Sequence, residues 1–273
     1  MSTNVLPEIP EGFASPFFYG SITAMTIAYA ADVAQVEAEL PGDALVPAEF
    51  DGQACVTVGY QSYLAMFSDA SVVVTEIDLG VLAIPAVKRR EVPRVAFADY
   101  ARGAEQTKLF GTFPLQVACD NELAISAGKR LFGEPKFHTS MQASVPSMNN
   151  PEVGTWQLRC MHPADGAAER ECIFSVAFDP SVAAAVKSSI SPMTTYGIAD
   201  GSLIASRWAI FQESAFFDLR RCADADRAQV RYGSAGHSMG ESMEKLIGDR
   251  PASGVWIHQS PPAAARYRPY LIV

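Results

Sequence analysis

The alternation of apolar and polar stretches predicts a chain that is rich in strands and has a few short helices. Strands are expected where apolar and β-branched residues dominate a run of five or more positions. The predicted strands are residues 22–29, 55–66, 72–87, 113–119, 156–161 and 171–178. The last two are expected to pair as a hairpin around the turn at residues 163–166. Residues 88–108 are polar and interrupted, and are expected to form an excursion between strands.

Capping and breaking residues indicate where helices begin and end. Asp32 is a suitable N-cap for a first helix, which Pro41 ends. Residues 238–247 are expected to form another short helix. Residues 203–221 mix aromatic and apolar side chains, and we expect a strand followed by a helix there. The chain shows no regular alternation of strands and helices, which argues against a doubly wound parallel sheet.

A third predicted helix leads to the most informative lysine of the chain. Asp120 or Asn121 caps it, and Gly133 and Pro135 end it. Its apolar positions recur at intervals of four, which places them on one face; they are Leu123, Ala127 and Leu131. Lys136 therefore lies just beyond a helix, where the chain becomes extended again.

Charge and composition narrow the classes of function. The chain has 21 basic and 30 acidic residues and a formal charge of −9. This balance argues against nucleic acid as a partner, because phosphate binding needs clustered Lys and Arg. An odd number of cysteines without CxxC spacing favours reduced thiols and a cytoplasmic location. No signal peptide and no apolar run long enough to cross a membrane are found, so no membrane association is expected.

Motifs for several other chemistries are weak. The four histidines are scattered and lack HExxH spacing, so no metal site is expected. Residues 233–236 lack the strand and helix that a dinucleotide-binding glycine loop requires. The string Gly236-His237-Ser238-Met239-Gly240 satisfies G-x-S-x-G, but residues 231–235 do not form a convincing buried strand before it. We therefore favour a loop there over a hydrolase nucleophile at Ser238.

The segment from Asp120 to Phe137 resembles the acetoacetate decarboxylase family, whose signature is a Gly-Arg-Glu helix followed by Gly-x-Pro-Lys. Gly128 and the run Gly133-x-Pro135-Lys136 match that signature, while Lys129 and Arg130 stand where the family has Arg and Glu. Val74-Thr75-Glu76 resembles the acidic active-site strand of the family. The resemblance covers residues 17 to about 247.

This resemblance implies an α+β fold, mostly an antiparallel β cone or barrel with short peripheral helices. It implies one domain over residues 1–273 with an extended N-terminal arm at 1–20, assembled into a homo-oligomer. It further implies a small keto-acid substrate, no cofactor, Lys136 as the nucleophile that forms a Schiff base, and Glu76 as an acid or base.

An amine attacks a ketone only when it is neutral, so such a lysine needs a lowered pKa or a base that takes its proton. Apolar neighbours such as Phe132 and Phe137 are expected to lower the pKa by burial. Phe137 stands where the decarboxylases have a second lysine, and Ser21 or Ile22 stands where they have an arginine. These departures favour pyruvate aldol condensation and dehydration, with 3-oxo acid decarboxylation as the alternative.

Five further residues are candidates for substrate contact: Arg130, Glu134, Gln116, Phe137 and Tyr267. Glu134 lies two positions before Lys136 and would share its side of a strand, although a turn carboxylate is an equal interpretation. Tyr267 and Tyr270 would reach a neighbouring site or subunit, or serve in packing. Two other classes of function stay open, namely a binding protein without catalysis and a serine hydrolase that uses Ser238.

Overall fold

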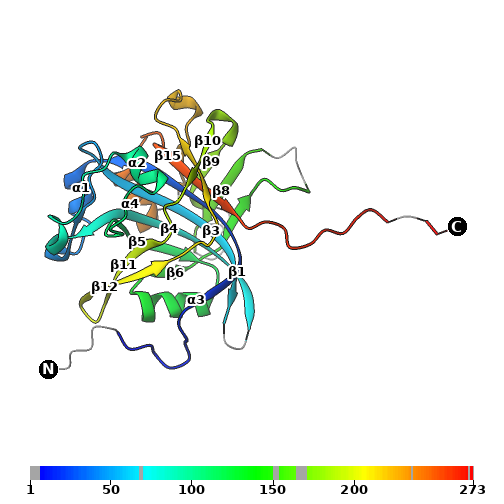
Figure 1. Ribbon diagram of the computed structural model, residues 1–273, viewed down its shortest axis with the longest axis horizontal. Helices are drawn as coiled ribbons and strands as arrows, with labels where there is room; N and C mark the ends of the chain where they lie inside the picture. Colours follow the sequence, from blue (N-terminus) through cyan, green and yellow to red (C-terminus); the bar gives the residue numbers. More distant parts are fainter. Residues whose placement is uncertain are drawn as a thin grey trace.

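The computed structural model describes residues 7–67, 70–149, 154–163, 171–234, 236–269 and 271–272. Two sheets and a few short helices make up the fold (Figure 1). The large sheet contains β1 (Phe18–Ala31), β2 (Leu45–Pro47), β3 (Ala54–Met66), β4 (Ser71–Pro85), β5 (Gly111–Cys119), β6 (Lys136–His138), β10 (Ala185–Ser188), β11 (Met193–Ala199), β12 (Ser202–Trp208), β13 (Ser214–Asp218) and β15 (Gly254–Gln259). The small sheet contains β7 (Met141–Ser144), β8 (Trp156–Met161), β9 (Cys172–Phe178) and β14 (Val230–Tyr232).

The strand order of the large sheet is β10-β13-β15-β1-β3-β4-β5-β11-β12, with β2 beside β4 and β6 beside β5. Its pairs are antiparallel except for β5 with β11 and β5 with β6. The expected α+β class is confirmed. Within the described ranges the outer strands β10 and β12 do not pair with each other, so the sheet is open and the predicted barrel is not closed.

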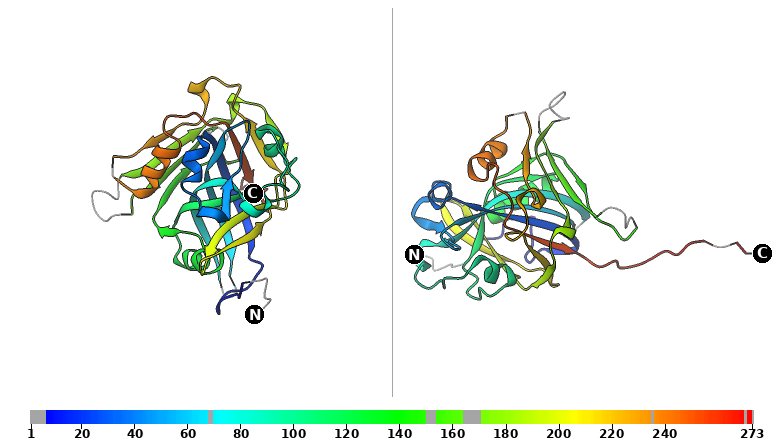
Figure 2. Two further views of the ribbon diagram at one scale, coloured as in Figure 1. Left: turned by 90° about the vertical axis from the view of Figure 1, so that its left-hand side faces the viewer. Right: turned by 90° about the horizontal axis from the view of Figure 1, so that it is seen from above.

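The two faces of the large sheet have different roles. Alternate residues of the central strands, such as Ile27, Val58 and Leu79, are fully buried against the small sheet and α4 (Ser238–Leu246). This stack forms the main core and is visible in the side views of Figure 2. The intervening residues face the opposite way and line a cavity. The alternation of a strand therefore separates a packing face from a functional face.

The other helices are short and lie at the periphery: α1 (Val33–Glu37), α2 (Phe97–Arg102), α3 (Glu122–Ala127) and the π-helix η3 (Gly128–Phe132). Single 3-10 turns occur at η1 (Gly42–Ala44), η2 (Ala86–Lys88), η5 (Pro180–Val182) and η6 (Asp224–Asp226). In the part of the chain that is described, no helix is long and apolar enough to cross a membrane.

Most of the expected elements are present. Asp32 caps α1, Asn121 caps α3, and β8 pairs with β9 as the predicted hairpin. Residues 164–166 of the expected turn lie outside the described residues. The helix expected within residues 203–221 is wrong, because β13 occupies that place between β10 and β15.

The face expected for the third helix is also partly wrong. Leu123 is 41% exposed, whereas Ala124 and Ile125 are buried. The helix continues into the wider turn of η3, which changes the spacing of residues that share a face. Residues 88–108 include α2, a helix that the sequence did not indicate.

Candidate active site

Lys136 lies at the end of a row of residues that crosses five strands. In the register of the large sheet, Thr26 pairs with Gly59, Gly59 with Asp78, Asp78 with Val117, and Val117 with Lys136. Residues paired in this way project from the same side of a sheet. The row thus carries the lysine onto the functional face, together with a carboxylate from β4.

The residues of the Gly-x-Pro-Lys signature shape the turn that presents the lysine. Gly133 has φ +63°, the left-handed conformation that favours glycine, and it ends η3. Gly128 serves a different purpose: a Cβ there would lie 2.3 Å from Cε of Lys136 and 2.8 Å from Oε2 of Glu134. The missing side chain leaves the space through which Lys136 extends.

The amine of Lys136 lies between two carboxylates. Its Nζ is 2.5 Å from Oε1 of Glu76 and 3.2 Å from Oε2 of Glu134. Lys136 is 7% exposed and Glu76 is 3% exposed, so the first pair is almost fully withdrawn from solvent. A buried charge is tolerated only where partners of opposite charge and hydrogen bonds compensate it.

Three further side chains hold Glu76 in place. Gln61 Nε2 donates to Oε2 of Glu76 at 2.9 Å, and the hydroxyl of Tyr63 donates to Oε1 at 3.1 Å. The thiol of Cys119 lies 3.3 Å from the same oxygen. None of the three was singled out in the sequence. Gln61 pairs with Glu76, and Glu76 pairs with Cys119, so strand register brings them together and no local motif marks them.

Asp78 is a second carboxylate on β4 that the sequence analysis missed. It lines the cavity, and a Cβ at the paired Gly59 would lie 2.3 Å from its Oδ1, so the glycine makes room for the carboxyl group. Burial, followed by the nearby Glu76 and Glu134, raises the pKa of Asp78 to about 7. The spacing Glu76-x-Asp78 could have indicated it, since alternate residues of a strand share a face.

The expected lowering of the lysine pKa is wrong. Burial does lower the pKa of Lys136, but the carboxylates of Glu134 and Glu76 outweigh it and raise the pKa above its ordinary value. Burial raises the pKa of Glu134 as well. At neutral pH the lysine is therefore an ammonium ion, and its proton must pass to a neighbouring group before the nitrogen can attack a carbonyl.

The cavity above this cluster has a volume of about 700 Å³. Glu76, Asp78, Glu134 and Lys136 lie on its wall, and Tyr19 lines it from β1. Burial raises the pKa of Tyr19 to about 12, with Glu76 adding to the effect, so its phenol stays protonated. The volume falls within the range of about 300–1,000 Å³ that is usual for small-molecule sites.

Of the five proposed substrate contacts, only Glu134 lies beside the lysine. Arg130 is exposed, and its guanidinium lies 5.2 Å from the ring centroid of Phe13. Phe137 points away from the cavity, with its ring 4.9 Å from that of His237. Phe132, in contrast, does line the cavity.

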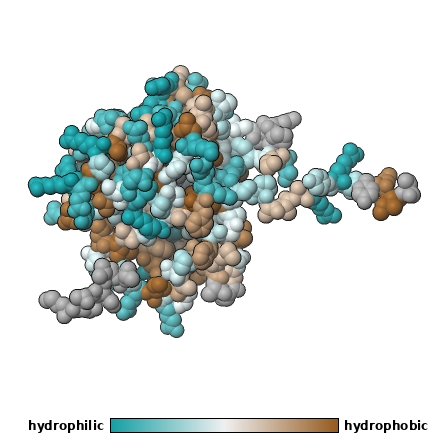
Figure 3. Space-filling view, in the orientation of Figure 1, coloured by the Kyte–Doolittle hydropathy of each residue, from teal (hydrophilic) through white to brown (hydrophobic). Residues whose placement is uncertain are grey.

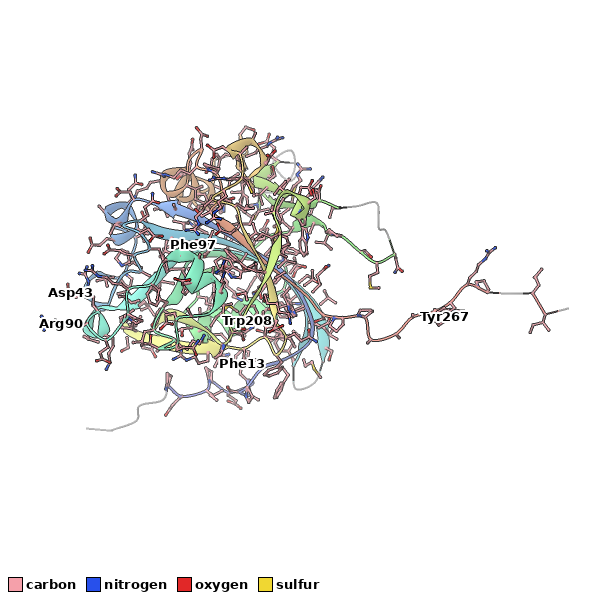
Figure 4. All side chains as sticks on the ribbon, turned by 45° about the horizontal axis from the view of Figure 1, so that its top comes forward. Phe13, Asp43, Arg90, Phe97, Trp208 and Tyr267 are labelled. Carbon is pink, nitrogen blue, oxygen red and sulfur yellow. The ribbon has the colours of Figure 1, made fainter. Side chains whose placement is uncertain are left out.

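Gln116 and Tyr267 also lie outside the cavity. Gln116 accepts a hydrogen bond from Ser238 and donates one to Ser242, so its amide faces α4. Tyr267 is 89% exposed on a C-terminal segment that extends away from the body (Figure 4). The same segment carries apolar residues near its end (Figure 3). Tyr270 is outside the described residues.

Among the described residues, the hydroxyl of Ser238 makes no hydrogen bond to a histidine, the base that a serine hydrolase requires. A strand, β14, precedes it, but β14 is a short edge strand that ends at Tyr232 and exposes Arg231, so residues 231–235 do not form a buried strand. The hydroxyl of Ser238 donates to Gln116, and Nδ1 of His237 accepts the backbone N–H of Met239. The described residues contain no group of three or more His, Cys, Asp or Glu side chains that could hold a metal ion.

Comparison of the fold with solved structures places the chain among acetoacetate decarboxylase-like folds. The sequence itself matches no protein-family model and no curated protein. An acetoacetate decarboxylase-like enzyme from Sphingomonas wittichii RW1 superposes with a TM-score of 0.53 at 16% identity, over 89% of each chain. The family resemblance is thus confirmed at the level of the fold.

Two more structures illustrate the range of this fold. The enduracididine biosynthesis enzyme MppR complexed with pyruvate gives a TM-score of 0.58 at 10% identity, covering 89% of this chain and 86% of that one. Acetoacetate decarboxylase from Legionella pneumophila gives a TM-score of 0.54 at 11% identity, covering 93% and 88%.

Proposed function

We propose that the protein is a carbon–carbon lyase that acts on a small keto acid through a Schiff base on Lys136, with pyruvate aldol condensation and dehydration as its reaction. The observation that carries the proposal is the placement of a buried lysine amine between Glu76 and Glu134 on the wall of a large cavity. A purely structural ion pair needs no cavity above it.

The first step is capture of the keto acid. Glu134 takes a proton from the ammonium of Lys136, since burial raises the pKa of this carboxyl group above that of an ordinary glutamate. The neutral nitrogen attacks the ketone carbon, the carbonyl oxygen leaves as water, and a protonated imine remains. The positive nitrogen then withdraws electrons from the neighbouring carbon.

The second step is carbon–carbon bond formation. A carboxylate removes a proton from the methyl group of the imine, which gives an enamine on Lys136. The enamine carbon attacks the carbonyl carbon of an aldehyde, whose oxygen takes up a proton. Loss of that hydroxyl as water and hydrolysis of the imine release an unsaturated 2-oxo acid and the free lysine. The cluster of Glu76, Asp78 and Glu134 supplies acids and bases for these transfers.

The surroundings of Lys136 favour this reaction over decarboxylation of a 3-oxo acid. A decarboxylase benefits from a lysine that a neighbouring cation keeps neutral, whereas here carboxylates raise the lysine pKa. Aldol condensation and dehydration instead require several proton transfers, which suit a site with three carboxyl groups. The MppR enzyme has been solved with the condensation product of pyruvate and imidazole 4-carboxaldehyde, which agrees with the preference.

Reductive trapping tests the proposal directly. Borohydride added with pyruvate should attach one reduced pyruvate to Lys136, detected by intact mass and peptide mapping, and Lys136→Ala should abolish the adduct. Pyruvate and an aldehyde should then yield an unsaturated 2-oxo acid, followed by absorbance. Rapid CO2 release from acetoacetate, lost in Lys136→Ala and without product from pyruvate and an aldehyde, would select the decarboxylase. Keto-acid binding without an adduct would identify a binding protein.

A further inference from the structure

A smaller chamber of about 80 Å³ adjoins this cavity. The two spaces share several wall residues, among them Thr26, Thr57, Met193 and Trp208, so they lie side by side. The chamber lies against α2 and the loop that follows it, where Tyr100 and other aromatic and aliphatic side chains form the wall. Trp208 is labelled in Figure 4.

Asp78 marks the boundary between the lysine and this chamber. In the cross-strand row, it stands between Val117, which neighbours Lys136, and Gly59, which neighbours Thr26. The carboxyl group of Asp78 lies over Gly59. Glu76 already pairs with the amine of Lys136. Asp78 itself makes no hydrogen bond or ion pair with any other described side chain. A group that extends from Lys136 towards Thr26 therefore passes Asp78.

Several polar groups in the chamber wall already have hydrogen-bond partners within the protein. Glu105 accepts two backbone N–H groups of its own loop, and Nζ of Lys108 donates to the carbonyl of Ile190 at 3.0 Å. The indole N–H of Trp256 donates to a backbone carbonyl at 3.1 Å. Burial lowers the pKa of His258, which keeps its ring neutral. The surface left for a ligand is mainly hydrocarbon and aromatic.

We infer that the chamber holds the apolar body of the second substrate, an aldehyde with a hydrocarbon or aromatic tail, whose carbonyl lies beside Asp78 and faces the enamine on Lys136. This inference rests on the proposed function and names its substrate class. A space needs about 10–15 Å³ in this measure to hold one water-sized group, so the chamber of about 80 Å³ takes roughly five to eight non-hydrogen atoms of such a tail. The cavity of about 700 Å³ leaves room for pyruvate and the aldehyde carbonyl together.

Asp78 has a defined part in the step. As the enamine carbon bonds to the aldehyde carbon, the electron pair of the carbonyl moves to its oxygen, which takes the proton of the Asp78 carboxyl group. The enamine nitrogen returns to the protonated imine at the same time. Asp78 is left as a carboxylate and takes the proton from the carbon that loses one in the dehydration. The hydroxyl leaves as water with the proton that a neighbouring carboxylate removed earlier from the methyl group of the imine.

A series of straight-chain aldehydes from acetaldehyde to octanal, each with pyruvate, tests the inference. The kcat/KM of the native protein should rise roughly three- to fourfold per methylene until the chamber is full, the effect of burying one CH2 group. Met193→Trp fills the junction of the two spaces, and the ratio of kcat/KM for octanal to that for acetaldehyde should fall at least ~10-fold. Met148→Trp is the matched control, since Met148 is 82% exposed and outside the cavity.

Pyruvate trapping on Lys136 in each variant separates the possible outcomes. If pyruvate forms the adduct but kcat/KM stays constant or falls as the aldehyde lengthens, only the chamber assignment is overturned. The same holds if Met193→Trp leaves the ratio of kcat/KM for octanal to that for acetaldehyde unchanged. A fall of the same size in Met148→Trp overturns it too, because the effect would then not depend on the chamber. If the native protein forms no pyruvate adduct, the proposed function fails and this inference fails with it.

Discussion

Substitution of Gly128 by alanine should separate the position of the lysine from the stability of the fold. Gly128 has helical backbone angles, φ −57° and ψ −48°, so the backbone accepts alanine without strain. Alanine is favoured over glycine within a helix by about 1 kcal/mol. The new methyl group, however, would lie 2.3 Å from Cε and 2.6 Å from Cδ of Lys136, closer than carbon atoms approach.

The flexible lysine side chain, and not the backbone, should yield to this contact. Its amine then moves by about 1 Å or more from Glu76, and a displacement of this size costs on the order of 100-fold in rate at a catalytic group. We expect the free energy of unfolding of Gly128→Ala to lie within about 1 kcal/mol of that of the native protein. Borohydride trapping of pyruvate should slow by about 100-fold.

Two measurements on the same preparations separate the position of the lysine from the stability of the fold. Urea unfolding gives the stability, and intact mass gives the rate of adduct formation. Gly154→Ala is the control, because no atom of the described residues, its chain neighbours aside, lies within 4 Å of the added Cβ. Trapping at the native rate in Gly128→Ala would refute the idea that the missing side chain positions Lys136. A loss of several kcal/mol would show that the backbone moves instead.

Further predictions concern the carboxylates and the assembly. Glu76→Gln keeps the size of the side chain, and steady-state turnover should fall by about 10²–10⁴-fold if Glu76 transfers protons; unchanged turnover would remove it from that role. Asp78 binds its proton more tightly in the folded chain, with a pKa raised from 3.8 to about 7, so this group destabilises the fold increasingly as pH rises across that interval. Urea titrations should therefore show Asp78→Asn gaining stability over the native protein between pH ~4 and ~7, by at most about 4 kcal/mol, and a pH-independent difference would contradict the raised pKa. The chain should behave as a homo-oligomer in light scattering at micromolar concentration, and a monomer would contradict the expectation drawn from the family resemblance.

Local patterns were sufficient for much of the fold and for the lysine. Runs of β-branched residues located β3 and β4, and Asn121 and Gly133 located the ends of the helical segment before Lys136. Glu76 was accessible in the same way, because its strand resembles a known acidic strand. Each of these features depends on neighbours along the chain, which a single sequence displays.

Features that depend on strand register could not be predicted from the sequence. Gln61, Tyr63 and Cys119 reach Glu76 only because β3, β4 and β5 pair as they do. The direction of the lysine pKa was wrong because two carboxylates outweigh burial: Glu134, which is two positions away in the sequence, and Glu76, which β4 brings across.

Competition between local preference and pairing explains the error at residues 203–221. The short apolar run around Phe216 and Phe217 does not by itself distinguish a helix from a strand. The edges of β10 and β15, which are formed elsewhere in the sequence, fix them in β13.

The row that crosses five strands also makes the site a late product of folding. Lys136 and Glu76 are 60 positions apart, and Thr26 at the far end of the row pairs with Trp256 in the C-terminal strand β15. Contacts of such long sequence separation form slowly, because each closes a large loop of chain. A nascent chain that still lacks β15 already contains Lys136 and its carboxylates, but the wall of the cavity around them is incomplete. Under the proposed function, we expect pyruvate to form an adduct with a refolding chain only after β15 has joined the sheet.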